Sequence, residues 1–331
     1  MPSNSLIYLL LSFFVSASCA DKSSENTGSP EENKEVENVS IASLEYEIPS
    51  LLGEGAFWNH KTQELFWVDI EGKKFHVYDP GTGTNRSFPT PTRIGTVVPY
   101  KQNQVIIALE DGIYSIHPRF GTIAEFAEIE KDATINRFND GKCDPNGNLW
   151  VGSMNLKEDR ASGAVYKISE QGEVSKMIEG VTISNGIVWT RDGSTMYYID
   201  TPTGAIRAYD FDPATSTISN ARTAVAVSPA LGYPDGMAID AEDKLWVGLW
   251  NGNAVARFDP LTGKLISRIE VPAHNVTACA FGGPDLDKLY ITTASVDMTK
   301  AEMEKYPLAG SIFVANPGVK GVPSKFFGKN E

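Results

Sequence analysis

Four polar side chains stand at nearly the same distance before a short apolar run, and their oxygens are suited to binding a metal. The pairs are Glu54 and Leu65, Asn139 and Leu149, Asn185 and Met196, and Asp235 and Leu245, with the polar residue ten or eleven positions earlier. Carboxylate and amide oxygens are ligands for Ca²⁺, Mg²⁺ or Mn²⁺. If the fold brings these positions together, the Glu and the Asp would repel each other unless a cation lay between them.

Each of these positions also has a simpler interpretation. Asn185-Gly186 and Asp235-Gly236 are dipeptides typical of turns, so any one of them fits a turn as well as a ligand. A shared offset in four places is harder to explain by turns alone. Twelve residues before Val105 and Leu289, the corresponding positions hold Arg93 and Thr277.

A cationic side chain accompanies the amide at position 139. Arg137 precedes Asn139 by two residues, and on a strand both would point to the same face. A guanidinium near a metal is suited to binding an oxygen or carboxylate of a substrate. The alternative is that Arg137 forms a salt bridge with another side chain in the wall of the protein's central channel. Asp140 would point the other way and hold the local turn through backbone N–H groups.

The polar positions belong to a repeated unit. Its apolar strand cores begin at Leu65, Val105, Leu149, Met196, Leu245 and Leu289, with steps of 40, 44, 47, 49 and 44 residues. Most cores follow a turn such as Asp144-Pro145-Asn146-Gly147, and a further strand comes after. Steps of about 40–50 residues with about four strands each are typical of propeller blades.

The sequence therefore predicts an all-β, six-bladed β-propeller over residues 44–331, with a metal site at the mouth of the central channel. Its ends would close when residues 44–48 pair beside residues 311–314, which protects both sheet edges. Residues 299–305 are the one helical segment expected. Trp150, Trp189 and Trp246 are predicted to pack in blade cores. A β-sandwich and a solenoid are less consistent with six repeats of the same turn chemistry.

The N-terminal residues differ in composition. Residues 6–15 are apolar except for Ser12, too short to span a bilayer, and end in small residues before Cys19. Residues 1–19 are predicted to be a signal peptide, either cleaved to release a secreted protein or of the lipoprotein type with a lipid anchor at Cys19. Residues 20–43 would form a disordered acidic tether. We expect export to the periplasm or the outer membrane, or secretion.

Composition excludes several classes of protein. The net charge is −13, and residues 21–40 contribute −4 of it through six acidic and two basic side chains. No block of Lys and Arg is present, which argues against a nucleic-acid partner. Three cysteines and four histidines, without metal-ligand spacing, make a disulfide framework, a zinc finger or a His-based triad poor explanations.

Several motifs together resemble the regucalcin (senescence marker protein)/gluconolactonase family. They are Gly53-Glu54-Gly55 with Trp58, residues 136–142 (NRFNDGK), Gly152-Ser153-Met154, Ile183-Ser184-Asn185-Gly186, Tyr198-Ile199-Asp200 and Pro234-Asp235-Gly236-Met237. The resemblance implies a propeller with one divalent cation (Ca²⁺, Mn²⁺, Mg²⁺ or Zn²⁺) bound by Glu54, Asn185 and Asp235. It also implies a sugar lactone held by Arg137 and Asn139, with Asp235 as general base.

The implied activity is metal-dependent hydrolysis of a gluconolactone-type sugar lactone to an aldonic acid. Two alternatives remain: a calcium- or ligand-binding propeller without turnover, and a related metal-dependent esterase. The segment after Met154 is shorter than is usual in the family, which leaves the role of Glu158 and the choice of lactone open.

Overall fold

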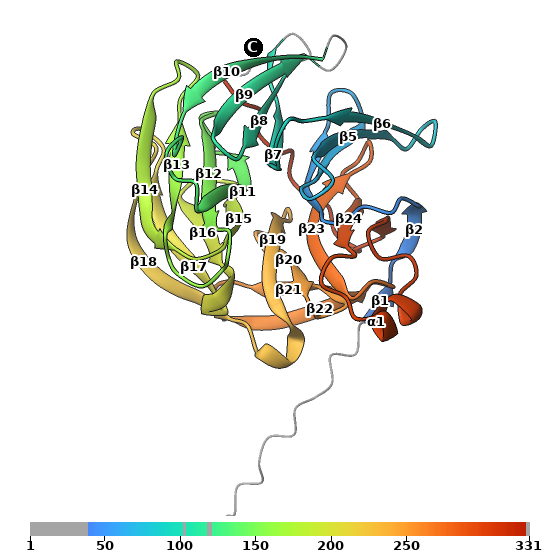
Figure 1. The fold of residues 1–331 in the computed structure, drawn as a ribbon. Helices are drawn as coiled ribbons and strands as arrows, with labels where there is room; N and C mark the ends of the chain where they lie inside the picture. The colour runs from blue at the N-terminus through green and yellow to red at the C-terminus, as the bar shows by residue number, and fades with distance from the viewer. Residues whose placement is uncertain (1–38, 102–103, 118–120, 329–331) are drawn as a thin grey trace, which may run out of the picture. The chain divides into compact units, whose positions relative to one another are not determined.

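Six antiparallel sheets surround a central axis in the computed structural model, which describes residues 39–101, 104–117 and 121–328 (Figure 1). The innermost strands are β3 (Gly53–Asn59), β7 (Ile94–Pro99), β11 (Asn136–Cys143), β15 (Ser184–Trp189), β19 (Tyr233–Ile239) and β23 (Asn275–Gly282). The second strands are β4 (Glu64–Asp69), β8 (Val105–Leu109), β12 (Leu149–Asn155), β16 (Thr195–Asp200), β20 (Leu245–Trp250) and β24 (Lys288–Ala294). The expected six-bladed β-propeller is confirmed.

The outer half of each blade follows the same order. The third strands are β5 (Lys74–Asp79), β9 (Gly112–His117), β13 (Gly163–Ile168), β17 (Ala205–Asp212), β21 (Ala254–Asp259) and β25 (Ile312–Ala315). The outer strands are β6 (Thr84–Pro89), β10 (Thr122–Glu128), β14 (Val174–Val181), β18 (Thr217–Ala226), β22 (Lys264–Glu270) and β2 (Ser43–Tyr46). Within the described residues every predicted apolar core therefore lies on a second strand.

The ring closes as predicted, in the last blade. There β2, from the start of the described chain, pairs antiparallel with β25, so that Leu44 lies opposite Phe313 and Tyr46 opposite Ile312. A short additional strand, β1 (Val39–Ile41), pairs parallel with β22 at the edge of the fifth blade.

The structured part thus begins earlier than the predicted boundary at residue 44. Val39–Ile41 lay in the predicted tether, but its backbone groups satisfy an otherwise open sheet edge. The predicted signal peptide, Cys19 and residues 20–38 of the predicted tether lie outside the described residues.

Burial decreases from the axis outward. The innermost strands are buried almost throughout, whereas most residues of outer strands such as β6, β14 and β18 are exposed or half-buried. The apolar core accordingly lies between neighbouring blades. Trp150 of the third blade packs on Trp189 and Phe211 of the fourth, with ring centroids 5.8 and 6.1 Å away. The packing role predicted for Trp150, Trp189 and Trp246 is confirmed by their burial.

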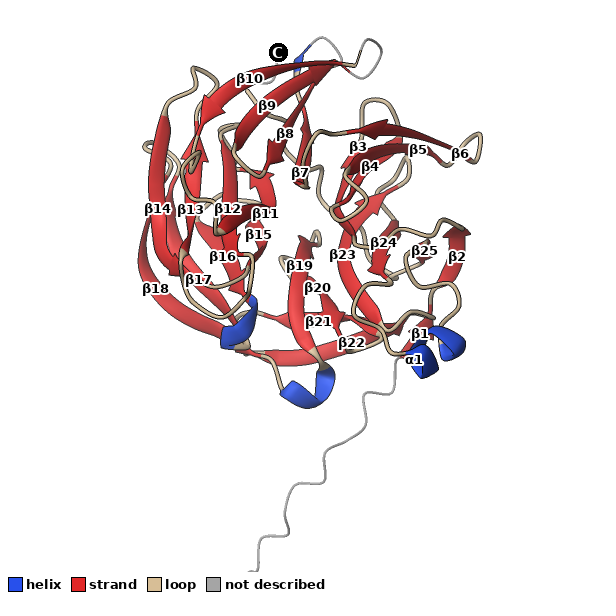
Figure 2. Ribbon diagram, viewed as in Figure 1, coloured by secondary structure: helices blue, strands red, loops and turns tan. Residues whose placement is uncertain are grey.

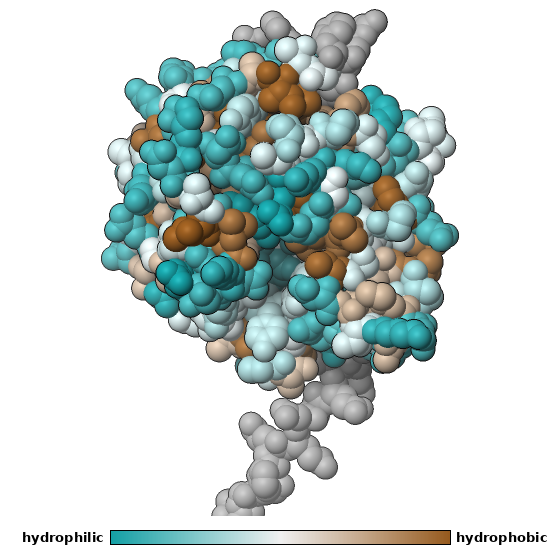
Figure 3. Space-filling model, viewed as in Figure 1, coloured by the Kyte–Doolittle hydropathy of each residue, from teal (hydrophilic) through white to brown (hydrophobic). Residues whose placement is uncertain are grey.

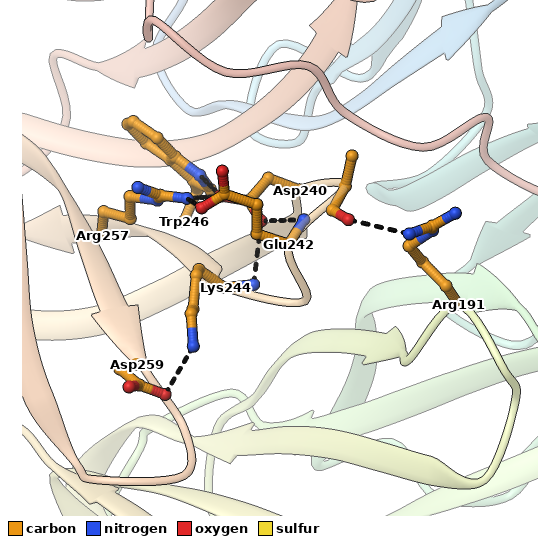
Figure 4. Close-up of polar contacts among 8 residues, drawn as sticks. Arg191, Asp240, Glu242, Lys244, Trp246, Arg257 and Asp259 are labelled. Atoms are coloured by element: carbon orange, nitrogen blue, oxygen red, sulfur yellow. Dashed lines mark hydrogen bonds and ion pairs between the residues drawn. The ribbon is translucent and has the colours of Figure 1, made fainter.

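The repeated turn before the second strand is built on a buried carboxylate. Asp240 accepts hydrogen bonds from the backbone N–H groups of Glu242 (2.8 Å) and Lys244 (2.9 Å) and from the indole N–H of Trp246 (2.9 Å) (Figure 4). It also pairs with Arg257 at 2.6 Å. Asp144 makes the equivalent bonds to its own turn and to Trp150. Because these carboxylates are fully partnered, they stabilise the fold rather than form a site.

Helical structure in the described chain is brief (Figure 2). The one α-helix is α1 (Lys300–Lys305), and it lies within the predicted helical segment, residues 299–305. Thr299 caps its N-terminus: its side chain accepts from the N–H of Glu302 in a capping box. Two 3₁₀ turns, η2 (Thr201–Thr203) and η3 (Pro229–Leu231), precede β17 and β19. None of these helices is long and apolar enough to cross a membrane.

After β25 the chain passes over the ends of several blades. The N–H of Gly321 bonds to Leu286 O and that of Phe327 to Pro99 O, at 2.8 and 2.9 Å. The N–H of Gly328 bonds to Gly147 O at 2.9 Å. The C-terminal segment therefore links the sixth blade to the second and third.

Candidate active site

A β-bulge occurs at the same level of every innermost strand. Pairing with the second strand shifts between Glu54 and Phe57, Ile94 and Thr96, Phe138 and Gly141, Ser184 and Ile187, Pro234 and Met237, and Val276 and Cys279. A bulge re-aims a side chain away from the regular alternation. The repeated sequence offset of Glu54, Asn139, Asn185 and Asp235 is therefore the offset of a repeated bulge.

The turn interpretation of the Asn-Gly and Asp-Gly pairs is wrong, because both pairs lie within strands. A Cβ on Gly186 would come within 2.6 Å of the Met237 Cβ, and one on Gly236 within 2.5 Å of the Ala278 Cβ. Non-bonded carbon atoms in proteins do not approach each other so closely. Glycine follows the polar residue because the innermost strand of the next blade approaches too closely for any side chain.

A cavity of about 420 Å³ opens where these bulges meet. It is lined by Leu52, Glu54, Glu71, Arg137, Asn139, Met154, Glu158, Ile183, Asn185, Thr201, Pro202, Tyr233, Asp235, Trp250, Asn251, Val296 and Asp297. All five predicted site residues are among them, and each is at most 7% exposed. On the face shown in Figure 3, strongly hydrophilic residues lie at the central hollow, with hydrophobic residues to either side.

Two carboxylates face each other in this cavity. Burial and the neighbouring Asp140 charge raise the pKa of Glu54 to about 8, partly offset by the Gly55 N–H at 2.8 Å, a hydrogen bond with Asp235 and the Arg137 charge. Burial and the charge of Glu54 likewise raise the pKa of Asp235 well above its ordinary value. Without a cation the pair holds a proton near neutral pH. A divalent cation between the two groups would remove that repulsion.

The third predicted ligand is oriented by its neighbours. The Thr201 hydroxyl donates to Pro234 O (2.8 Å) and so accepts from the Asn185 Nδ2 (2.7 Å). This fixes the amide of Asn185 with its Oδ1 toward Asn139, whose Nδ2 donates to it at 3.1 Å. The amide oxygen of Asn185 is thus the atom presented to the cavity.

Arg137 and Asn139 meet as predicted for residues on one strand face. The Arg137 Nη1 donates to the Asn139 Oδ1 at 2.6 Å and to Phe138 O at 3.0 Å. The salt bridge considered as an alternative for Arg137 is absent from the described part of the chain. Its remaining guanidinium N–H groups have no protein acceptor among those residues, so they can bind an oxygen of a ligand.

Two other positions counted by offset lie elsewhere. Arg93 precedes the bulge of its blade, where Gly95 stands instead, and it pairs with Glu71 (2.7 Å) and Glu110 (2.9 Å). Thr277 lies at a bulge, but its hydroxyl contacts Gly53 O and the Thr292 hydroxyl, so it joins blades rather than lining the cavity. Asp140 accepts from the Gly141 N–H at 2.7 Å, so it bonds a backbone group as predicted, but within β11 and not in a turn.

Several further cavity residues were not assigned a role from the sequence. Burial lowers the pKa of Arg137, and the charges of the nearby Glu71 and Glu158 oppose that shift and favour the protonated form. Glu158, whose role was left open, stands in the turn after β12 with a φ of 56°. Tyr233 and Trp250 lie opposite each other on β19 and β20 and form an aromatic wall. Their positions follow from blade pairing, so no single motif could have revealed them.

The donor set fits a hard or intermediate divalent cation. Glu54, Asp235 and the amide oxygen of Asn185 are oxygen donors only, and the two carboxylates lack a counter-charge between them. No group of three or more His, Cys, Asp or Glu side chains arranged as metal ligands occurs in residues 39–101, 104–117 and 121–328. An amide as third donor therefore distinguishes this candidate site from the usual clusters.

Comparison with known proteins gives consistent matches. Residues 52–295 match the family described as SMP-30/Gluconolactonase/LRE-like region. The protein YvrE of Bacillus subtilis, whose name proposes sugar lactone lactonase activity, is 38% identical over 83% of this chain and 94% of its own. Regucalcin of Xenopus laevis is 36% identical over 84% of this chain and 95% of its own.

A solved structure extends the match to three dimensions. The structure of regucalcin from Agrobacterium tumefaciens, described as a calcium-binding protein, superposes with a TM-score of 0.80 at 28% identity. It covers 88% of this chain and 97% of that one. The family and these relatives suggest activity of the gluconolactonase or sugar lactonase kind. Both fold and sequence therefore show that the chain belongs to the SMP-30/gluconolactonase/LRE-like family.

Proposed function

We propose that this protein is a metal-dependent hydrolase that opens sugar lactones of the gluconolactone type to aldonic acids. One observation carries the proposal: Glu54, Asn185 and Asp235 meet in the same cavity as Arg137 and Asn139. A site that binds only a cation would need no more than Glu54, Asn185 and Asp235. The added guanidinium and amide supply hydrogen bonds to a polyhydroxylated ligand.

Each side chain has a role in this proposal. A divalent cation held by Glu54, Asn185 and Asp235 would act as a Lewis acid toward the lactone carbonyl. Arg137 and Asn139 hold ring and hydroxyl oxygens and so orient the ester bond. Asp235 accepts a proton from the attacking water while the water oxygen bonds to the carbonyl carbon. The ring C–O bond then breaks, and the proton passes to the departing ring oxygen.

The surroundings suit Asp235 to proton transfer. Its buried position and the adjacent Glu54 make it a stronger base than an exposed aspartate once it is ionised. Glu158 at the cavity edge extends the polar wall beside Arg137, where it can bind a further hydroxyl of the sugar. The aromatic pair Tyr233 and Trp250 supplies an apolar surface for the C–H face of the ring.

Acid release from a panel of sugar lactones, aliphatic lactones and simple esters would test the proposal. The protein is stripped with chelator and then supplied with Ca²⁺, Mn²⁺, Mg²⁺ or Zn²⁺. We expect turnover of sugar lactones that disappears with chelator and returns with metal. Turnover of simple esters in preference to lactones would instead favour the related metal-dependent esterase.

A second candidate is a calcium-binding propeller without turnover, favoured by the calcium-binding description of the Agrobacterium tumefaciens structure. Tight metal binding that requires Glu54 and Asp235, with no hydrolysis of any lactone in the panel, would support it. Arg137 and Asn139 then would have no ligand to hold, which is why we prefer the hydrolase.

We also propose that the protein is exported. The apolar residues 6–15, the small residues before Cys19 and the acidic segment after it are typical of a bacterial lipoprotein signal followed by a spacer. Mass spectrometry of the mature chain would distinguish the two routes. A lipidated Cys19 indicates an anchor, an unmodified shorter chain indicates secretion, and an intact Met1 would contradict export.

A further inference from the structure

A second cavity lies at the other end of the innermost strands. Its volume is about 350 Å³, and it is lined by residues near the ends of β11, β15, β19 and β23, including Cys143, Trp189, Ile239 and Phe281. The active-site cavity is lined by residues nearer the beginnings of β11, β15 and β19, together with β3, and the two cavities share no lining residue. We call the second one the far cavity.

The wall of the far cavity is largely apolar. Val188 and Trp189 come from the fourth blade, Ala238 and Ile239 from the fifth, and Phe281 from the sixth. The C-terminal segment contributes Val322 and Pro323. A pocket of this size and polarity buries an aliphatic or aromatic body of modest size.

Three cations surround this apolar wall, and none of them forms an ion pair in the described chain, although the charge of Asp140 acts on Lys142. The Lys142 Nζ donates to Met237 O at 2.8 Å, reaching from the third blade to the fifth. The Arg191 Nη1 donates to Ala241 O at 3.0 Å (Figure 4). Lys325 completes the set from the C-terminal segment.

The single acidic side chain that lines the far cavity, among the described residues, is already engaged. The carboxylate of Asp192 accepts from the Thr190 hydroxyl (2.7 Å) and from the N–H (3.0 Å) and hydroxyl (2.8 Å) of Ser194. It therefore holds its own turn, and its single negative charge offsets only one of the three positive charges. The far cavity combines an apolar wall with three cationic and one anionic lining side chains, an excess of positive charge, whereas the whole chain is acidic.

We propose that the far cavity is a second ligand site, for a small anion with an apolar body, such as a medium-chain carboxylate. Lys142, Arg191 and Lys325 would bind the charged group, and Trp189, Ile239 and Phe281 would contact the hydrocarbon. This site is independent of lactone hydrolysis, since none of its residues lines the active site.

Calorimetric titration of octanoate into the metal-loaded full chain tests the proposal, with acetate and octanol as probes that carry only the charge or only the chain. We expect octanoate to bind with a dissociation constant on the order of 1 mM or lower, and each partial probe about tenfold more weakly. The double variant Arg191→Gln/Lys325→Gln should bind octanoate about tenfold more weakly. Both residues are outside the active site, so lactone turnover should be unchanged.

Matched variants separate the far cavity from other sites. Lys300→Gln/Lys305→Gln removes the same charge from α1 and should leave octanoate affinity unchanged, whereas Ala238→Leu should reduce it by filling the cavity. Absence of octanoate binding at 10 mM, on the order of ten times the expected constant, would overturn the proposal. So would binding that persists in the Arg191→Gln/Lys325→Gln variant and is displaced by gluconate, because the anion would then occupy the active site.

Discussion

The two ends of the propeller channel are made by the same innermost strands, yet they differ in chemistry. At the beginnings of the strands, bulges present Glu54, Asn139, Asn185 and Asp235 to a polar cavity. Past the bulges, pairing is regular and the strands end in residues such as Cys143 and Phe281 around an apolar cavity. One end gathers carboxylates, and the other gathers unpaired cations.

This contrast shows how a repeated fold acquires a site. The blades share turns, core residues and strand order, which serve stability. The bulge changes only the direction of one or two side chains in each blade. Different residue types can stand at the bulge because the hydrogen bonds between the two strands are already interrupted at that point. Chemistry is therefore concentrated at the irregular level of an otherwise regular sheet.

The largest expected effect comes from removing the carboxylate of Asp235. Asp235→Ala should lower kcat/KM for lactone hydrolysis by about 10²- to 10⁴-fold, because it removes both the general base and a metal ligand. Calorimetry should show loss of divalent-cation binding. Asp192→Ala, which removes a carboxylate at the far end, should preserve turnover. Equal losses in the two variants would mean that the two ends do not differ in function.

Asn139→Ala should act mainly on the substrate. Loss of its contacts to Arg137 and Asn185 should raise KM about tenfold while cation affinity stays within about threefold. Steady-state kinetics at saturating metal would measure the first value and calorimetry the second. Retained metal with an unchanged KM would contradict the substrate-binding role.

The aromatic wall gives a smaller effect. Trp250→Ala should raise KM for sugar lactones about fivefold with little change in kcat, since the indole contacts the ligand but not the reacting bond. Trp250→Phe is the matched control and should restore most of the affinity. If the phenylalanine variant is as impaired as the alanine variant, stacking is not the cause.

The smallest effect concerns stability. In the metal-free protein the pKa of Glu54 is raised from 4.5 to about 8, so its stabilising contribution is complete below pH 4.5 and is lost as pH rises through 8. Between these values the Tm of chelated protein should fall by about 5 °C. Adding Ca²⁺ at pH 8 should restore it.

Thermal unfolding of Glu54→Gln provides the comparison for this pH dependence. The variant has no carboxyl group to titrate at position 54, so its Tm without metal should vary less between pH 5 and pH 8. A wild-type Tm that is equally flat in chelator would show that the carboxyl pair is not strained by ionisation.

Much of the architecture could be predicted from the order of residues. Alternating apolar runs, repeated Asp-centred turns and the 40–49-residue steps identify six blades, because each feature depends on local backbone preference. The offsets of Glu54, Asn139, Asn185 and Asp235 identified the bulge position on the innermost strands of four blades. The pairing of residues 44–46 with β25 followed from the need to close a sheet edge.

Other features required the tertiary structure. Counting back from Val105 gave Arg93, whereas the bulge of that blade stands at Gly95. The count fails there because the loop between the first and second strands varies in length, so only strand pairing shows which residue lies at the bulge. Glu71, Tyr233 and Trp250 reach the active site through contacts between blades that no local pattern encodes. The sequence by itself determined the blades and the polar residues at their inner edges. Only the closed ring decided which of those residues share a cavity, since distances across the channel depend on all six blades together.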